Sequence, residues 1–259
     1  MKKYSFILPL ALFSSLLVSC GAKTLSEVDG IALAKKIQAF RADSSFAYKT
    51  DKFTYSINLS GDSMGNGTSK IDARIIKGEY IYYNLVSSTS KKAQNETVYV
   101  YSKDGIHYFA EDDGTNKTYS ELSQSAFDAA LESNTSGIRN TVIAMADGVY
   151  ESLSNFTEAS SSSSANSQTS TTSTYSFASS GDGNLVVTWD TTEKDSETNA
   201  TSHEVITFDH YYPVSVSEVI KGTRVSSSSS TSLDGEGTMN FAWDTCSPFY
   251  PDLSKYTKQ

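Results

Sequence analysis

Cysteine and histidine are scarce in this sequence of 259 residues, which has two cysteines and three histidines. A histidine-based metal site would need His107, His203 and His210 to converge with acids or thiols. His203 and His210 lie seven residues apart in a strand-like run, so we expect their side chains to point to opposite faces. The acidic clusters near Glu111 and Asp190 lack the ligand spacing of a calcium loop. The sequence therefore predicts no metal site and no cofactor.

Positive charge is also scarce, because 30 acidic residues outweigh 21 basic residues and give a formal net charge of -9. A chain with this balance is repelled by nucleic-acid phosphates and is not drawn to anionic lipid headgroups. The composition therefore argues against a nucleic-acid partner. Attachment to a membrane would have to come from a covalent lipid instead.

The apolar run from Phe6 to Val18 is well short of the roughly 20 residues that span a bilayer. Two lysines precede the run, and Leu17-Val18-Ser19-Cys20 closes it, which is the pattern of a bacterial lipoprotein signal. The small Ser19 lets a signal peptidase cut before Cys20, whose thiol can then take a diacylglyceryl group. A transmembrane helix, or an ordinary signal peptide with an accidental cysteine, fits this length and these flanks less well.

We therefore predict that residues 1–19 are a signal peptide and that Cys20 is the lipid attachment site, on the extracytoplasmic face of a bacterial membrane. Acylated Cys20 would leave Cys246 without a disulfide partner, and we expect Cys246 to be a buried small residue. Residues 20–24 would form a tether that extends by at most about 3.5 Å per residue. The folded domain, residues 25–259, would then sit almost on the bilayer.

Hydrophobic periodicity predicts an N-terminal helix followed by a sheet. Ser26 and Asp29 resemble a capping box, and apolar residues at helical spacing predict a helix over residues 27–41. From residue 53 the period changes to two, which predicts strands over 53–59, 71–75, 80–86, 96–102 and 106–110. Their connections are short, and Asp104-Gly105 is a hairpin signal, so the strands should form an antiparallel meander.

The middle of the chain is predicted to be helical. Ser123 is a good N-cap, with Leu122 and Phe127 as a hydrophobic staple. A second helix with a wide apolar face is predicted after Gly137, over residues 138–156. Strands then resume at 175–178, 185–189, 205–208, 214–220 and 239–243. Two serine-rich segments, 160–173 and 226–232, are predicted to be long exposed loops within one domain.

Gly61-Asp62-Ser63-Met64-Gly65 matches the G-x-S-x-G nucleophile elbow, which needs a strand-to-helix turn to expose its serine. Here the motif lies between two short antiparallel strands, where glycine and polar residues are what a hairpin loop requires. We therefore predict that Ser63 is not a nucleophile. No other motif indicates catalysis, and the sequence predicts a protein that is not an enzyme.

Aromatic residues crowd the first group of strands, where the sequence leaves two interpretations open. One face could line a cavity while the other meets water, or the rings could simply fill a core. The aromatic residues concerned are Tyr80, Tyr82, Tyr83, Tyr99, Tyr101, Tyr108 and Phe109.

The order of elements behind the Leu17-Val18-Ser19-Cys20 box resembles the lipoprotein-carrier superfamily, which includes LolA and LolB, mycobacterial lipid-binding lipoproteins and periplasmic stress-sensing relatives. The resemblance covers Leu25 to about Trp243 and rests on element order and spacing. It implies an α+β fold with a strongly bent antiparallel sheet, an incompletely closed β-barrel. An N-terminal helix and two mid-chain helices would cover the concave face, with a hydrophobic cavity between.

The first functional hypothesis is a membrane-anchored protein that binds a lipid or other apolar ligand in that cavity. The alternative is a surface interaction or sensor module, with a filled core, that binds protein or glycan. An esterase-like enzyme using Ser63 is a distant third. For the first hypothesis the predicted ligand-lining residues are Phe53, Tyr55, Ile57, Leu59, Ile81, Tyr83, Leu85, Val142, Met145 and Val149.

Overall fold

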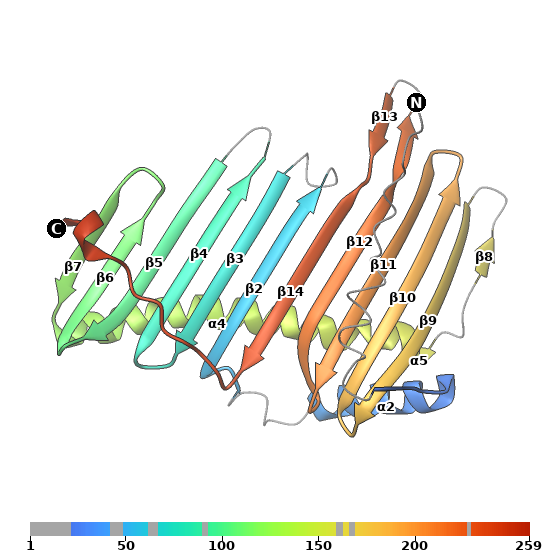
Figure 1. Cartoon of the computed structure of the whole chain (residues 1–259), viewed down its shortest axis with the longest axis horizontal. Coiled ribbons are helices and arrows are strands. Elements are labelled where there is room, and N and C mark those ends of the chain that lie inside the picture. Colours follow the sequence, from blue (N-terminus) through green and yellow to red (C-terminus); the bar gives the residue numbers. More distant parts are fainter. Residues whose placement is uncertain are drawn as a thin grey trace, which may run out of the picture.

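The computed structural model describes residues 22–41, 49–61, 67–89, 93–158, 163–165, 169–226 and 229–259. The chain has an α+β fold, with one large, bent sheet that does not close into a barrel (Figure 1). Within the described residues, no helix is long and apolar enough to cross a membrane.

Two antiparallel meanders lie side by side and form one continuous sheet. The N-terminal meander consists of β2 (Lys52–Gly61), β3 (Gly67–Ile76), β4 (Tyr80–Ser88), β5 (Ala93–Lys103), β6 (Ile106–Asp112) and β7 (Lys117–Leu122). The C-terminal meander consists of β9 (Thr169–Gly181), β10 (Asn184–Asp195), β11 (Thr198–Asp209), β12 (Tyr212–Ser226) and β14 (Gly235–Trp243). Antiparallel pairing of β14 with β2 joins the two meanders, with Phe53 opposite Trp243.

Short strands complete the sheet at its margins. β1 (Lys23–Thr24) and β8 (Ser163–Ala165) pair with β9 at one edge, and β13 (Ser229–Ser232) pairs with β12. At the opposite edge β15 (Thr257–Lys258) pairs with β7, and this is the one parallel pairing among the described strands. The predicted Asp104-Gly105 hairpin is confirmed, because both residues have the positive φ that a tight hairpin turn requires.

The N-terminal helix is confirmed as α2 (Glu27–Arg41). Ser26 caps it as predicted, since its Oγ donates to Asp29 Oδ2 over 2.6 Å and accepts from the Asp29 backbone N–H. α2 packs on β9 and β10. The approach is close at Gly30, where an added Cβ would lie 2.2 Å from Cγ of Phe177.

The prediction that Gly137 separates two helices is wrong. One helix, α4 (Gln124–Ser152), runs through Gly137, and the break comes at Leu153, before α5 (Ser154–Glu158). An apolar stripe stays in helical register on both sides of Gly137, so burial of that stripe outweighs the roughly 1 kcal/mol that glycine costs a helix. The buried residues of the stripe are Phe127, Leu131, Val142, Ala146 and Val149.

The prediction of two long serine-rich loops is wrong for the parts that the structure describes. Residues 169–173 begin β9, residues 163–165 form β8, and residues 229–232 form β13. Each gains backbone hydrogen bonds from a neighbouring strand that extends beyond the helices. Strand pairing therefore orders these residues, although a serine-rich composition offers little apolar surface to bury.

Candidate functional site

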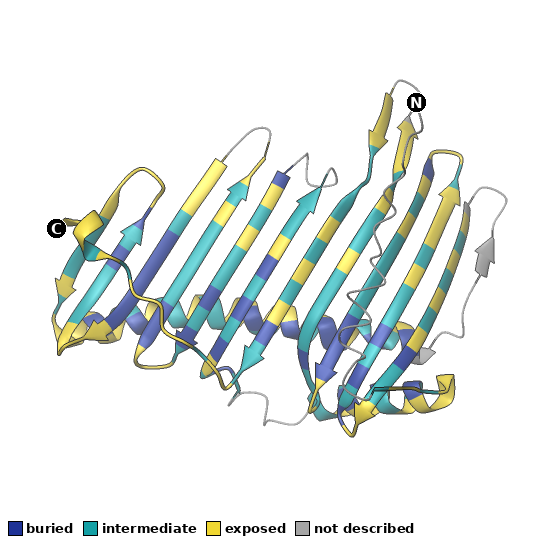
Figure 2. Cartoon of the chain, viewed as in Figure 1, coloured by how far each residue is buried: buried dark blue, intermediate teal, exposed yellow. Residues whose placement is uncertain are grey.

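The helix-side face of the sheet is fully buried at one end of the strands and partly open at the other. Along β2, Phe53 and Tyr55 are buried, whereas Leu59 is only partly buried. The same gradient runs from Ile75 to Ile71 along β3. α4 crosses the strands near their buried ends, and the burial colours change along each strand (Figure 2).

Six of the ten predicted lining residues are buried in the main hydrophobic core between helices and sheet. They are Phe53, Tyr55, Ile57, Ile81, Val142 and Val149. Leu59 and Tyr83 pack against this core and are partly buried, and Leu85 on β4 is also partly buried. The space directly beneath α4 is thus filled by side chains.

Met145 does not face the sheet, so the expectation that it helps to cover the sheet is wrong. Its side chain is 39% exposed, whereas Ala146, one residue on, is fully buried. The buried positions Val142, Ala146 and Val149 follow the helical spacing of four and three residues, and Met145 falls outside that stripe. Spacing alone did not separate Met145 from Ala146.

Beyond the cover of α4, an apolar row crosses five adjacent strands in direct register. Val216 on β12 is paired with Met239, Met239 with Ile57, Ile57 with Ile71, and Ile71 with Leu85. Apart from Ile57, these side chains are only partly buried. We refer to the partly buried residues Leu59, Ile71, Tyr83, Leu85, Val216 and Met239 as the open strip.

A pair of carboxylates lies next to the open strip on the same face. Glu204 on β11 is directly opposite Glu218 on β12, and Glu218 is in turn opposite Gly237. Burial and then the charge of Glu218 raise the pKa of Glu204 to about 6. Neither carboxylate has an ion-pair or hydrogen-bond partner among the described residues. The pair therefore makes one end of this apolar face sensitive to pH.

Two tyrosines lie on this face, Tyr55 buried in the core and Tyr83 partly buried in the open strip. Burial, and then electrostatic interaction with Tyr83, raises the pKa of Tyr55 to about 12. Burial and then the charge of Glu96 raise the pKa of Tyr83. Both rings therefore stay neutral at physiological pH and present an aromatic body with a hydroxyl, a combination that suits a boundary between apolar and polar surroundings.

The opposite, outer face of the N-terminal meander carries a second aromatic cluster, which the C-terminal residues cover. We call residues 244–259 the strap. The strap crosses β2 to β6 and ends beside β7 (Figure 1). Beneath it Tyr80, Tyr99 and Tyr101 are buried. The second interpretation of the tyrosine crowd, core filling, thus holds for this face.

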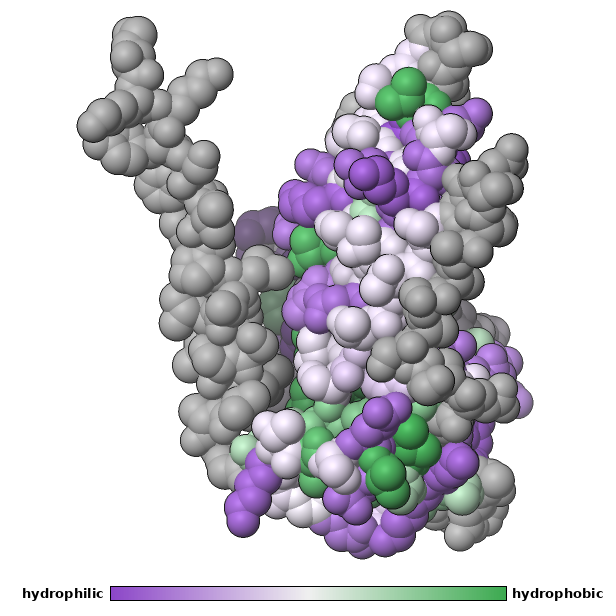
Figure 3. Space-filling model, turned by 90° about the vertical axis from the view of Figure 1, so that its right-hand side faces the viewer, coloured by the Kyte–Doolittle hydropathy of each residue, from purple (hydrophilic) through white to green (hydrophobic). Residues whose placement is uncertain are grey.

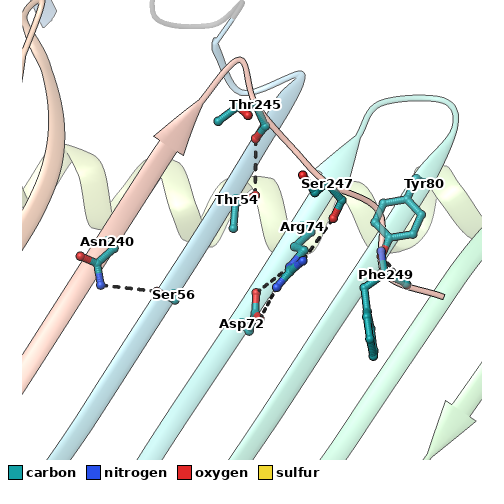
Figure 4. A network of polar contacts seen from close by, with 9 residues as sticks. All are labelled: Thr54, Ser56, Asp72, Arg74, Tyr80, Asn240, Thr245, Ser247 and Phe249. Carbon is teal, nitrogen blue, oxygen red and sulfur yellow. Dashed lines mark hydrogen bonds and ion pairs between the residues drawn. The ribbon is translucent and has the colours of Figure 1, made fainter. Parts of the chain in front are cut away.

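Hydrogen bonds hold the strap at its centre. The Tyr80 hydroxyl donates to the Phe249 carbonyl over 2.7 Å and accepts from the Phe249 N–H over 2.8 Å. Arg74, which is paired with Asp72, also donates to the Ser247 carbonyl (Figure 4). The sequence patterns considered above did not predict the strap. The signal that could have revealed it is the aromatic pair in Pro248-Phe249-Tyr250-Pro251, within a mainly polar segment.

Two hollows lie on the described part of the chain, and charged or polar residues contribute to the lining of both. One, of about 720 Å³, lies between the β6–β7 turn and the strap and is lined by residues such as Asp113, Lys117 and Lys255. The other, of about 350 Å³, lies between α2 and α4, beside the ion pair of Arg41 with Asp147. Neither lies between α4 and the sheet.

The remaining candidate residues do not converge. His107 stacks on Phe127, whereas His203 and His210 each bind a neighbouring aspartate, and the described residues contain no cluster that would hold a metal ion. Cys246 is partly buried, and burial raises the pKa of its thiol. Cys20 and Ser63 lie outside the described residues, but Gly61 and Gly67 on either side of Ser63 pair as neighbouring strands.

No protein-family model matches the sequence, and a search of curated proteins finds no match either.

Proposed function

We propose that this protein is a bacterial lipoprotein, anchored through Cys20 to the extracytoplasmic face of a membrane, that binds an acyl chain or similar apolar ligand along the open strip. The lipoprotein-carrier resemblance supports this proposal through its cavity between helices and a concave sheet. The ligand would lie beside α4, because buried side chains fill the space beneath the helix.

One observation carries the proposal. The apolar row from Val216 to Leu85 crosses five strands without a polar residue and is left partly open at the margin of α4. At about 4.8 Å between strands, such a row extends over about 19 Å, a length that suits an extended acyl chain. Burial of this surface by a ligand is favourable by about 25 cal/mol per Å².

A second function is favoured by the filled core. A surface interaction or sensor module needs no cavity, and neither of the two hollows lies between α4 and the sheet. The exposed aromatic residues of the strap, Phe249 and Tyr250, would then be the natural contact surface. In this case the open strip would bind nothing.

Two adjacent residues of β4 separate the two functions. Leu85 belongs to the open strip, whereas Val86 points to the outer face. Leu85→Lys places a charge in the strip opposite Glu96, which can pair with it, and should lower the affinity for a fluorescent fatty acid at least tenfold. Val86→Lys is the matched control and should leave the affinity unchanged.

The measurement is a titration of the purified full chain with the fluorescent fatty acid, together with mass spectrometry of lipid extracts. An unmodified chain that binds no probe and carries no lipid would refute ligand binding and leave the interaction module. Equal binding by both lysine variants would show that the ligand does not bind at the open strip.

A further inference from the structure

Exposed apolar side chains are distributed unequally between the two faces of the sheet. Among the described residues, the exposed large hydrophobic side chains are Val28, Val86, Ile106, Met145, Val225, Phe249 and Tyr250. Val28 and Met145 lie on helices. By strand alternation Val86, Ile106 and Val225 point to the outer face, and the other two belong to the strap that covers it.

Phe249 and Tyr250 form the centre of this outer surface, with side chains that are 51% and 42% exposed. Tyr82 and Tyr99 support the Phe249 ring from below, and Tyr101 supports the Tyr250 ring at a centroid distance of 5.2 Å. The two rings therefore stand on a fixed aromatic base. About half of each side chain remains exposed above this base.

The surroundings of these rings are close to neutral, although the whole chain has a net charge of -9. Four nearby cations are matched by acids in ion pairs, namely Arg74 with Asp72, Lys117 with Asp112, Lys255 with Asp252 and Lys258 with Glu121. Lys103, whose Nζ lies 5.9 Å from the centre of the Tyr250 ring, adds one positive charge without an acidic partner among the described residues. Anionic headgroups would thus meet little repulsion here. The surface would depend on its aromatic rings for attraction to a membrane.

The proposed anchor constrains the domain at the far end of the sheet. Cys20 is three residues from Lys23 in β1, so β1 would lie within about 10 Å of the bilayer. β1 pairs with β9, and β5, under the strap, is eight strands further along. At about 4.8 Å per strand the two ends are about 40 Å apart. An anchor at one edge leaves the sheet free to pivot unless a second contact exists.

We propose that a phospholipid bilayer is the partner of this outer surface, and that Phe249 and Tyr250 insert into its interfacial region. The inference rests on the proposed function through the lipid on Cys20. Aromatic side chains with a polar edge favour the membrane interface. The sheet would then lie along the membrane, held at both ends, with α4 and the open strip turned toward solvent.

Tryptophan at two matched positions tests this orientation. Phe249→Trp reports on the strap, and Met145→Trp reports on the helix side at a similar exposure, 51% against 39% for the native side chains. The lipidated full chain is reconstituted in vesicles of phosphatidylethanolamine with a minor share of phosphatidylglycerol, part of the lipid being brominated in its acyl chains. The unmodified chain gives the background from Trp189 and Trp243.

We expect the added emission of Phe249→Trp to shift to the blue and to be quenched by brominated lipid, and that of Met145→Trp to be unchanged. Quenching of Met145→Trp alone would put the helices on the membrane, and quenching of neither would leave the sheet upright. Either result overturns the proposal. Equal thermal midpoints of the variants and the unmodified chain show that folding is preserved.

Mass spectrometry of the same samples distinguishes failure of the anchor from failure of the orientation. An unmodified Cys20 thiol would refute the anchor, and the orientation with it. A lipidated Cys20 combined with unquenched Phe249→Trp would refute the orientation alone. A Cys20→Ser chain should lose most of its vesicle binding, because two aromatic side chains give only weak attachment without the lipid.

Discussion

The outer faces of the two meanders differ, although they belong to one sheet. In the N-terminal meander this face carries Tyr80, Tyr99 and Tyr101, which are buried under the strap. In the C-terminal meander the corresponding face is mainly polar. One cross-strand row there consists of Thr188, Val205, Ser217 and Thr238, and Val205 is its one apolar residue. Viewed from the β9 edge, most hydrophobic residues gather at the lower end, and the upper part is mainly neutral to hydrophilic with isolated hydrophobic residues (Figure 3).

The difference shows how side-chain composition decides where a second layer forms. Threonine has a high strand propensity and a hydroxyl that water can satisfy, so a strand rich in it needs no cover on that face. Tyrosine has similar strand propensity but a large apolar body. Burial of these tyrosines against the strap stabilises the strap in one ordered path over the sheet.

Among the changes that test this difference between the two faces, removal of the strap should have the largest effect on stability. A chain that ends at Trp243 exposes Tyr80, Tyr99 and Tyr101, and we expect a loss of unfolding free energy on the order of 3 to 5 kcal/mol. Denaturant titration measures the loss, and binding of an apolar dye reports the exposed rings. A loss below about 1 kcal/mol without dye binding would mean that the strap is not part of the stable fold.

A methyl group at Gly30 should have the next largest effect, at the contact of α2 with the C-terminal meander. Gly30→Ala forces α2 away from Phe177 and should cost about 1 to 3 kcal/mol of unfolding free energy. Gly137→Ala in α4 is the matched control, because its Cβ would meet nothing within 4 Å. It should stabilise the protein by about 0.5 to 1 kcal/mol. Thermal unfolding of both variants would show whether the signs are opposite.

Loss of one hydroxyl tests how strongly the strap is held. Tyr80→Phe leaves the Phe249 N–H and carbonyl without their partner and should cost about 1 to 2 kcal/mol. Tyr82→Phe is the control, because the Tyr82 hydroxyl has no hydrogen-bond partner in the part of the chain that the structure describes. Equal stability of the two variants in urea would contradict a specific role of Tyr80.

The smallest effect is expected at the carboxylate pair in the C-terminal meander. The pKa of Glu204 rises from 4.5 to about 6 on folding, so the folded state favours the protonated acid. This stabilisation is present below pH 4.5 and is lost as the pH rises to about 6. The shift corresponds to about 2 kcal/mol, and solvent screening of this partly exposed side chain reduces it to about 1 kcal/mol.

Glu204→Gln removes the charge and should therefore stabilise the protein by about 1 kcal/mol at pH 7 and by nearly nothing at pH 4. Glu218→Gln removes the repulsion between the Glu204 and Glu218 carboxylates but leaves Glu204 partly buried and charged. Because Glu218 is the more exposed of the two, we expect a smaller gain in unfolding free energy. Urea unfolding at both pH values is the measurement. A gain that is equal at pH 4 and pH 7 would point to a cause other than ionisation.

Local patterns predicted most of the elements, because their signals lie within a few residues. The cap at Ser26, the alternation along β2 and the Asp104-Gly105 turn each gave the correct structure. The break placed at Gly137 was wrong, since the intrinsic cost of glycine is small and tertiary burial of the helix stripe outweighs it. Met145 was misplaced because two adjacent helical positions fit the same apolar spacing.

The sequence by itself determined the α+β class, the antiparallel order of the strands in the N-terminal meander, and the faces on which β2 to β4 bury their side chains. Pairing of β14 with β2, the path of the strap, and the extension of serine-rich residues into paired strands were decided only by the tertiary structure. These contacts join residues far apart in the chain. Their stability comes from hydrogen bonds and burial that exist only after both partners are in place.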